Sequence, residues 1–368
     1  MTDTTLITGA DGYVGSGLAK LLLATGDDHL VLAVRAAEGS ERLAGKRAYL
    51  AKELGEQNAA RYSVVPADLS LDDTLELIDP EPVTRIVHTA AVTKYNVERE
   101  LAQAVNIDGT ARIAAFAARC DNLQRFALLS TLYAVGKRKG DVPEQGYDDS
   151  AGFVNNYEWS KWSAEDVVTR KHADLPVSIL RLPNVIADDD SGRVVQQNSF
   201  HNTLKLYYYG LLSLVPGDRS TRQFYATGQF TLAAILRLLD PAVPAGFYHT
   251  APHPEATAPL EEVVEAIFGV FENDRSYQRR KLLRPLYCNR DSFFDLVEAS
   301  KALRSGPIYD ALDSVIPFAE QLFLPKDFRN DALRAVWPEY DLTDPVELVA
   351  RTAADLVASR WGRRTQEE

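Results

Sequence analysis

The chain has 368 residues, of which 46% are hydrophobic and 25% are charged, so its composition is that of an ordinary globular protein with a large core. This excludes a disordered regulator, a collagen-like fibre and a disulfide-stapled miniprotein. The net charge of −12 argues against whole-chain attraction to nucleic acid or to an anionic membrane. The sequence shows neither a signal-peptide pattern nor an apolar run of the ~20 residues that a membrane span needs. We therefore expect a cytoplasmic protein.

The first 185 residues alternate short apolar runs with longer amphipathic segments, which predicts a parallel sheet covered by helices on both faces. The runs that we interpret as strands are Thr4–Thr8, Leu30–Arg35, Arg61–Val65, Arg85–His88, Arg125–Leu129 and Val177–Leu182. A helix that ends at Gly26 is expected between the first two, and another over Asn155–Lys171. The fold class is therefore α/β, with a doubly wound parallel Rossmann sheet.

The pattern loosens after Leu182, where helices are separated by prolines. An aromatic-rich helix is expected over Phe200–Leu214 and an amphipathic one over Pro345–Ser359. We predict a Rossmann domain over residues 1–185 and a smaller, mostly helical substrate-binding or lid region over 186–368. One further strand of the sheet is expected to return near residues 246–250. The second region is expected to cover the carboxyl edge of the sheet, where ligands of α/β proteins bind.

A glycine-rich turn with the pattern G-x-x-G-x-x-G follows the first strand and opens the first helix. In such a turn the first glycine permits a tight bend, the second lets backbone approach a pyrophosphate, and the third allows close packing of helix on strand. The helix N-terminus attracts the phosphates. The residues of this turn that we expect to contact a dinucleotide are Gly9, Asp11, Gly12, Tyr13, Val14 and Gly15.

The second predicted strand ends in Arg35, where a fold that prefers NAD places an acidic residue for the ribose hydroxyls. A guanidinium pairs instead with a 2′-phosphate, and Arg42 follows shortly after. The expected cofactor is therefore NADP(H). The two cysteines, Cys120 and Cys288, fit no zinc motif or disulfide framework, and the histidines show no metal-ligand spacing, so we expect no metal.

A Tyr-x-x-x-Lys motif, Tyr157 to Lys161, lies in the helix that follows the fifth strand. Residues four apart share one face of a helix, so phenol and ammonium can point into one site. The ammonium is expected to favour the phenolate and so to lower the phenol pKa. The fifth strand ends in Ser130 and Thr131, and either hydroxyl could bind a reacting carbonyl oxygen or simply cap local backbone.

Together these motifs resemble the extended short-chain dehydrogenases/reductases. The resemblance implies hydride transfer to a carbonyl carbon, with Tyr157 as proton donor, Lys161 as its partner and as a ligand of the nicotinamide ribose, and Thr131, with Ser130 as runner-up, on the oxygen. It also implies further cofactor contacts at Asp68, Leu69, Thr89, Ala90, Ala91, Asn106, Pro183 and Val185.

Several segments are similar to one branch, the fatty acyl-CoA reductases and the thioester-reductase domains of carboxylic acid reductases and peptide synthetases. These segments are Val34-Arg35-Ala36, His88–Thr93, Asn156–Lys161 and the spaced residues Gly192, Phe200, Gly210 and Pro216. The likeness implies NADPH-dependent reduction of an acyl thioester, bound to CoA or a carrier protein, to an aldehyde. Residues Phe224–Thr227 depart from the branch, where an acidic motif is usual.

Two alternatives remain open. A ketoreductase or alcohol dehydrogenase for a natural-product or lipid-like ketone would use the same residues. A sugar-nucleotide epimerase is less favoured, because such enzymes prefer an acidic residue where Arg35 stands. We expect a monomer or homodimer that binds a small-molecule or thioester-linked substrate and no nucleic acid.

Overall fold

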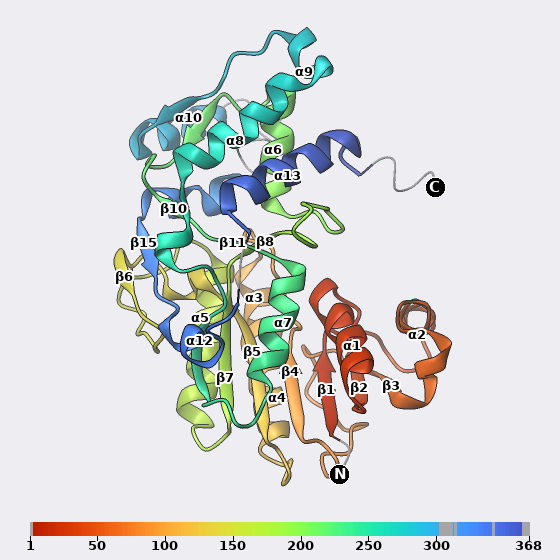
Figure 1. Ribbon diagram of the computed structural model, residues 1–368. Coiled ribbons are helices and arrows are strands. Elements are labelled where there is room, and N and C mark those ends of the chain that lie inside the picture. Colours follow the sequence, from red (N-terminus) through yellow and green to blue (C-terminus); the bar gives the residue numbers. More distant parts are fainter. Residues whose placement is uncertain (1–2, 302–311, 313–314, 341–342, 363–368) are drawn as a thin grey trace.

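The structure is a computed structural model that describes residues 3–301, 312, 315–340 and 343–362. A seven-stranded parallel sheet forms its centre, in the order β12-β7-β5-β4-β1-β2-β3 (Figure 1). The bounds of these strands in chain order are β1 Thr4–Thr8, β2 His29–Val34, β3 Tyr62–Pro66, β4 Arg85–His88, β5 Arg125–Thr131, β7 Val177–Leu182 and β12 Gly246–His249. Every residue of β1 and β5 is buried, as expected of strands covered on both faces.

Helices cover both faces of this sheet. One face carries α1 (Tyr13–Thr25), α2 (Glu41–Leu54) and α7 (Gly228–Leu238), whose apolar residues share one core with β1 and β2. The opposite face carries α4 (Gly109–Ala117) and α5 (Asn156–Lys171). A short α3 (Arg99–Ala102) runs into α4 through a π-helical turn over Gln103–Asp108, a form that is rare and frequent at functional sites.

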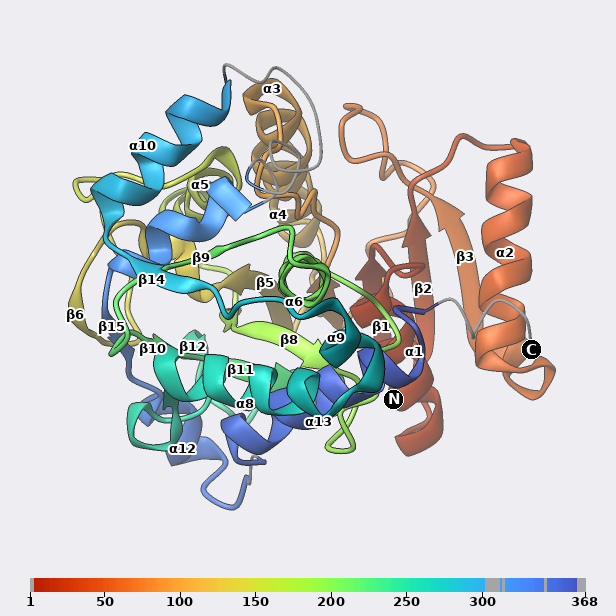
Figure 2. The ribbon, with the colours of Figure 1, turned by 90° about the horizontal axis from the view of Figure 1, so that it is seen from above.

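A further group of helices lies beyond the carboxyl ends of the strands (Figures 1 and 2). They are α6 (Ser199–Tyr209), α8 (Leu260–Asn273), α9 (Arg275–Arg280), α10 (Arg290–Lys301) and α13 (Pro345–Ala358). Their apolar faces form a second core, separate from the cores of the sheet, and α8 packs along α13. The short α12 (Asp331–Val336) instead packs against β12 at the edge of the sheet.

Within the described residues, four two-stranded ribbons lie outside the central sheet. They pair β6 (Gly140–Val142) with β15 (Lys326–Phe328), β8 (Asn184–Ala187) with β11 (Tyr225–Thr227), β9 (Leu214–Pro216) with β14 (Leu286–Cys288), and β10 (Arg222–Gln223) with β13 (Ala258–Pro259). Short 3-10 turns cover Glu56–Arg61, Leu132–Val135, Pro254–Ala256 and Glu320–Phe323. Because β8 follows β7 directly, the ribbon of β8 and β11 begins where β7 of the central sheet ends.

The α/β class and the parallel sheet predicted from sequence are confirmed, and most strand bounds agree within two residues. The aromatic helix differs from the prediction over Phe200–Leu214. It ends at Tyr209, because Gly210 adopts a left-handed conformation with φ of 69° and turns the chain into β9. The segment from Gly228 to His249 also returns to the sheet layer, since α7 packs on α1 and β12 pairs with β7.

Candidate active site

The glycine-rich turn lies at the carboxyl end of β1. Gly9 has a φ of 65°, and a Cβ atom built there would lie 2.9 Å from the Cα atom of Ala90. A Cβ atom on Gly15 would lie 2.3 Å from the carbonyl oxygen of Gly9, so only glycine allows α1 to pack so closely against the turn. Gly12 caps α1 without a side chain, which leaves the first-turn N–H groups free to bind an anion.

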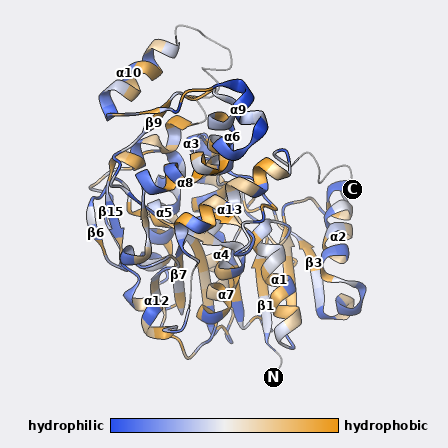
Figure 3. Ribbon diagram, turned by 45° about the horizontal axis from the view of Figure 1, so that its top comes forward, coloured by the Kyte–Doolittle hydropathy of each residue, from blue (hydrophilic) through white to orange (hydrophobic). Residues whose placement is uncertain are grey.

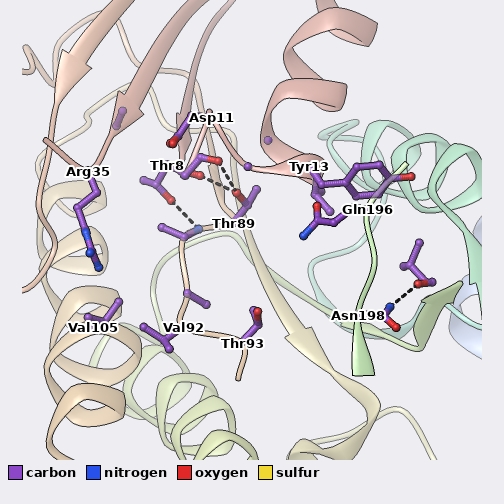
Figure 4. A pocket seen from close by; sticks show the side chains of 18 of the residues that line it. Thr8, Asp11, Tyr13, Arg35, Thr89, Val92, Thr93, Val105, Gln196 and Asn198 are labelled. Atoms are coloured by element: carbon purple, nitrogen blue, oxygen red, sulfur yellow. Dashed lines mark hydrogen bonds between the residues drawn. The ribbon is translucent and has the colours of Figure 1, made fainter. Parts of the chain in front are cut away.

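A pocket of about 420 Å³ opens beside this turn, across the ends of β1, β2 and β4 (Figure 4). Arg35 reaches into it from one side, and Tyr13, Gln196 and Asn198 lie on the opposite side (Figure 4). The predicted cofactor residues that line the pocket are Gly9, Asp11, Gly12, Tyr13, Val14, Gly15, Arg35, Asp68, Leu69, Thr89, Ala90, Ala91 and Val185. Its backbone N–H groups and its guanidinium fit a dinucleotide.

The charges at the Arg35 end of the pocket are arranged around Asp68. Burial alone would raise the pKa of this carboxyl group, but hydrogen bonds from Ser70 and the nearby guanidinium groups of Arg35 and Arg42 hold the pKa below its usual value. Lys46 also lines the pocket and forms an ion pair with Asp11. The Arg35 end therefore carries two cations that face the pocket, with Arg42 close behind.

Four residues predicted to bind the cofactor do not line this pocket: Arg42, Asn106, Lys161 and Pro183. Asn106 is buried in the π-helical turn, where its amide holds both the N–H and the carbonyl oxygen of Val92 and donates to Ser160 of α5 over 2.9 Å. Asn106 thus links the wall of the pocket at Val92 to helix α5. Pro183 lines a different cavity, described below.

Tyr157 and Thr131 line the same cavity at the end of β5, close enough for the Thr131 hydroxyl to lower the pKa of the phenol. The Thr131 hydroxyl also accepts a hydrogen bond from the N–H of Tyr133 over 3.3 Å. Burial raises the pKa of Tyr157 to about 12, the Thr131 hydroxyl opposes this rise, and the charge of Glu158 adds to it. This differs from the expectation that the ammonium of Lys161 lowers the phenol pKa. The Nζ atom of Lys161 instead donates to the carbonyl oxygen of Leu129 over 2.6 Å, and burial lowers the pKa of Lys161 to about 8.

The two candidate hydroxyls at the end of β5 have different partners. Ser130 donates to Glu165, whose carboxylate also forms a fully buried ion pair with Arg181 at 2.7 Å. Because the side chains of both Glu165 and Arg181 are buried, the Ser130 hydroxyl is part of a buried hydrogen-bond network. The Thr131 hydroxyl is the one that contacts Tyr157.

A second cavity, of about 300 Å³, lies beyond Tyr157 and Thr131 under the C-terminal helices. Its walls come from α6, α8, β9 and the segment 315–322, and most of the lining side chains are apolar or aromatic. Among the described residues that line it, none is Asp, Glu, Lys, Arg or His. The cavity meets the cofactor pocket where Thr93, Val185 and Asn198 line both.

Sequence reasoning missed several residues of this cavity. The ring of Tyr95 packs edge-on against Tyr157 with centroids 5.6 Å apart, and Phe318 packs on its other side. Gln321 lines the cavity and donates to the fully buried Glu158, whose pKa burial raises to about 7. Glu158 stands inside the Tyr-x-x-x-Lys motif and could have been noticed, but Phe318 and Gln321 lie about 160 residues away in a segment without any motif.

Segment 188–198 closes the pocket on the side away from the sheet. The Tyr13 hydroxyl donates to Asp188 over 2.8 Å, and Asp188 also pairs with Arg193. The N–H of Val194 donates to Asp355 of α13 over 3.0 Å.

In the described part of the chain, no helix is both long and apolar enough to cross a membrane.

Comparisons with known proteins agree with this architecture. The chain is 29% identical over 215 residues to the isonitrile lipopeptide synthase of Streptomyces coeruleorubidus, a match that covers 55% of this chain and 14% of that protein. It is 26% identical over 162 residues to the chloroplastic fatty acyl-CoA reductase 2 of Arabidopsis thaliana, covering 39% of this chain and 26% of the relative. The chain therefore corresponds to a minor part of each of these relatives.

Among solved structures, the terminal R domain from the myxalamid PKS-NRPS biosynthetic pathway superimposes with a TM-score of 0.77. The superposition covers 98% of this chain and 92% of that domain at 20% identity, and it shows that the two share a fold. Residues 7–232, more than half of the chain, match the NAD-binding family described as Male sterility protein. The protein therefore belongs to this family of nicotinamide-dependent oxidoreductases, which has the extended short-chain dehydrogenase/reductase fold.

Proposed function

We propose that the protein reduces an acyl thioester, presented on a carrier protein or on CoA, to an aldehyde with NADPH as the reductant. One observation carries the proposal: an uncharged, mainly apolar cavity ends at the Tyr157–Thr131 pair and adjoins the dinucleotide pocket. A long apolar acyl group can lie in such a cavity with its carbonyl at that pair. The similarity to a lipopeptide synthase and to a fatty acyl-CoA reductase supports the same substrate class.

The preference for NADPH is argued from the end of the cofactor pocket at β2. Arg35 is exposed, lines the pocket and stands where an acidic residue would hold the ribose hydroxyls of NADH. Its planar guanidinium can bind a 2′-phosphate in a bidentate manner, and Lys46 and Arg42 add positive charge nearby. The N-terminus of α1 would hold the pyrophosphate.

The residues at the end of β5 would act on the carbonyl oxygen of the substrate. The bound nicotinamide would supply a hydride to the carbonyl carbon. Tyr157 is protonated throughout the neutral pH range, because burial raises its pKa to about 12, so it can donate a hydrogen bond and then its proton to the oxygen. Thr131 supplies a second hydroxyl at that oxygen, and two preorganised donors stabilise the negative charge that develops there.

A thioester gives these residues a second task, since its tetrahedral adduct must expel a thiolate. A thiolate leaves much more readily than hydride, so the adduct collapses to an aldehyde once its oxygen is deprotonated again. Tyr157 can accept that proton back through the same hydrogen bond. The ammonium of Lys161 donates a hydrogen bond to the carbonyl oxygen of Leu129, in the strand that carries Thr131.

The alternatives differ in what the second cavity must hold. A sugar nucleotide carries a diphosphate, and burying two negative charges requires cations or many donors. The described lining offers no Lys or Arg for it, which argues against an epimerase. A ketone fits the cavity as well as a thioester, so the ketoreductase alternative stands.

A substrate panel tests the proposal. Wild-type protein is incubated with NADPH and, in separate reactions, with octanoyl-CoA, an octanoyl-carrier thioester, a medium-chain ketone and a UDP-sugar. Oxidation of NADPH and release of free thiol are both followed. We expect NADPH oxidation with thiol release for at least one thioester and no reaction with the UDP-sugar. NADPH oxidation by the ketone alone would replace this function with the ketoreductase.

A further inference from the structure

The most basic stretch of this acidic protein lies on and just after α9. Residues 275–284 contain five basic side chains and no acidic one, whereas the whole chain carries a net charge of −12. The five are Arg275, Arg279, Arg280, Lys281 and Arg284. Figure 3 shows α9 as a strongly hydrophilic segment at the end of the molecule that carries the C-terminal helices. Such a local reversal of charge is the electrostatic mark of an anionic partner.

Three of these five cations are free to meet such a partner. Arg284 is held by Glu265 and Glu272, and Arg280 donates to the carbonyl oxygen of Tyr208 over 2.7 Å. Arg275, Arg279 and Lys281 are exposed, and within the described part of the chain no ion pair holds them. Of the acidic residues nearby, Glu265 and Glu272 are engaged by Arg284, and Asp274 at the start of α9 accepts hydrogen bonds from Tyr208 and Tyr277.

Exposed apolar side chains adjoin these cations. Leu283 is 92% exposed and Leu286 72%, while Tyr209 and Leu211 at the end of α6 are 39% and 38% exposed. The guanidinium of Arg280 lies over the rings of Tyr208 and Tyr209, 4.5 and 4.6 Å from their centroids, and so joins α9 to α6. An apolar centre with a charged rim is the composition of a protein–protein interface. We call this area the α9 surface: Arg275, Arg279, Arg280, Lys281, Leu283, Leu286, Tyr209 and Leu211.

The α9 surface is connected to the active site through the elements that carry it. The neighbouring helix α8 lines the substrate cavity through Leu260 and Ile267, and α6 lines it through Phe200 and Tyr207. Trp361, which follows α13, packs 5.4 Å from the ring of Tyr208. The next residue, Gly362, lies beside Gln197, in the segment that closes the cofactor pocket. A protein bound at the α9 surface would therefore stand over the helices around the cavity.

We propose that the α9 surface docks an acidic acyl-carrier domain whose thioester enters the substrate cavity. This inference rests on the proposed function, because a thioester is the substrate that arrives tethered to another protein. A tethered substrate requires that its carrier be held close to the cavity, and opposite charges both speed that encounter and orient it. The free cations meet acidic side chains of the carrier, and Leu283 and Leu286 meet its apolar ones.

The experiment separates docking from chemistry by offering one acyl group in two forms. Octanoyl is supplied as a thioester on an acidic acyl carrier protein and as a thioester of free pantetheine, with NADPH in excess. The variant Arg275→Glu/Arg279→Glu/Lys281→Glu is compared with wild type and with a matched control, Lys20→Glu/Lys52→Glu/Lys171→Glu. The control changes the net charge equally at exposed lysines of α1, α2 and α5, away from the α9 surface.

For the carrier substrate we expect the α9 variant to raise KM at least about tenfold at low salt, with kcat little changed. The matched control keeps the wild-type KM, and the pantetheine thioester is reduced equally by all three proteins. Added salt raises the wild-type KM toward that of the variant. An unchanged KM in the α9 variant, or an equal loss with the pantetheine thioester, would overturn the inference.

The same proteins distinguish failure of the docking inference from failure of the proposed function. If pantetheine thioester is reduced but the carrier neither reacts nor binds, docking is wrong and the function stands. If no thioester is reduced, the function is wrong, and binding of the labelled carrier measured by fluorescence anisotropy still tests docking. Binding of wild type, and not of the α9 variant, to vesicles rich in anionic lipid with no carrier binding would assign the surface to a membrane instead.

Discussion

The cofactor pocket and the substrate cavity adjoin each other but are built on different principles. The pocket is made by backbone at the ends of neighbouring strands, with glycines where side chains would intrude, such as Gly9 and Gly15. The cavity is made by side chains from segments far apart in sequence, including α6, α8 and residues 315–322. The first kind of site recognises a constant chemical group, whereas the second can change its ligand whenever a lining residue changes.

The charges of the two regions follow the same division. The pocket carries Arg35 and Lys46, whose cations can bind phosphate groups, together with the carboxylates of Asp11, Asp68 and Asp188. The described lining of the cavity carries no formal charge. Tyr157 lines the cavity, which meets the pocket at Thr93, Val185 and Asn198. Each of the following predictions changes residues of one region, the catalytic pair, the cofactor pocket or the substrate cavity, and leaves the other regions unchanged.

The largest effect is expected for Tyr157→Phe, which removes the proton donor and keeps the ring. Turnover should fall by about 10²–10⁴-fold, the usual contribution of a positioned acid. Cofactor affinity and substrate KM should stay near their wild-type values, because the phenylalanine ring keeps the shape of the cavity wall and the cofactor pocket is unchanged. Steady-state kinetics and titration of NADPH measure the three quantities. Tyr248→Phe, a buried tyrosine that lines neither described cavity, is the matched control. Wild-type turnover in Tyr157→Phe would point to another donor.

The next effect is on the cofactor side alone. Arg35→Asp removes the guanidinium and adds a carboxylate that repels a 2′-phosphate, so the affinity for NADPH should fall by about 10–100-fold while that for NADH is kept or improved. Lys52→Asp, exposed at the far end of α2, controls for the change in net charge. Calorimetric titration with both cofactors checks this. Equal affinities of the wild type for NADPH and NADH would contradict the assignment of Arg35.

A pH dependence is expected from Lys161, whose pKa burial lowers to about 8. A lysine is protonated below its pKa, so the ammonium is present at pH 7 and is lost as pH rises through 8. Since Tyr157 stays protonated until about pH 12, the loss of activity on the alkaline side should follow Lys161. Above pH 8, kcat should fall by about tenfold per unit if the charge is required. In Lys161→Arg, which keeps its positive charge, kcat should stay constant over that range. If kcat of this variant still falls above pH 8, the fall does not come from Lys161.

The smallest effect is expected deep in the substrate cavity. Ile267→Phe adds volume to the wall that α8 contributes. For a long acyl thioester this should cost about 1 kcal/mol in kcat/KM, roughly fivefold, while an acetyl thioester reacts as before. Affinity for NADPH should not change. The check is a chain-length series of thioesters on the variant and on wild type, with Leu77→Phe, an exposed site, as control. An equal loss for all chain lengths would mean that Ile267 supports the fold and does not select substrates.

The same division explains what could be predicted from sequence. The strands, the glycine turn and Arg35 were predictable, because each rests on local pattern: apolar runs of strand length, or fixed spacing from the end of a strand. The end of α6 was misjudged because apolar residues continue past Gly210 into β9, so periodicity alone did not mark the stop. Tyr95 and Gln321 reach the cavity only through the tertiary fold, and no short-range pattern signals that.

The electrostatics of the catalytic residues also required the structure. Spacing placed Tyr157 and Lys161 on one helix, but it could not show that the ammonium would donate to Leu129 and that the phenol would be shielded by burial. Likewise, the adjacent hydroxyls of Ser130 and Thr131 look equivalent in sequence. They diverge because Ser130 faces the buried Glu165–Arg181 pair, a contact that depends on three separate elements.

The central claim is that the carbonyl reduced belongs to a thioester. The most direct test incubates the wild-type protein with NADPH and octanoyl-pantetheine thioester. It counts the NADPH oxidised and the thiol released, and then the aldehyde, as its hydrazone with dinitrophenylhydrazine added only after the reaction has been stopped with acid. The account predicts one free thiol and one aldehyde for each NADPH consumed, and a rate of thiol release from Tyr157→Phe that is about 10²–10⁴-fold lower. NADPH oxidation by a medium-chain ketone, with no thiol released from any thioester, would contradict it.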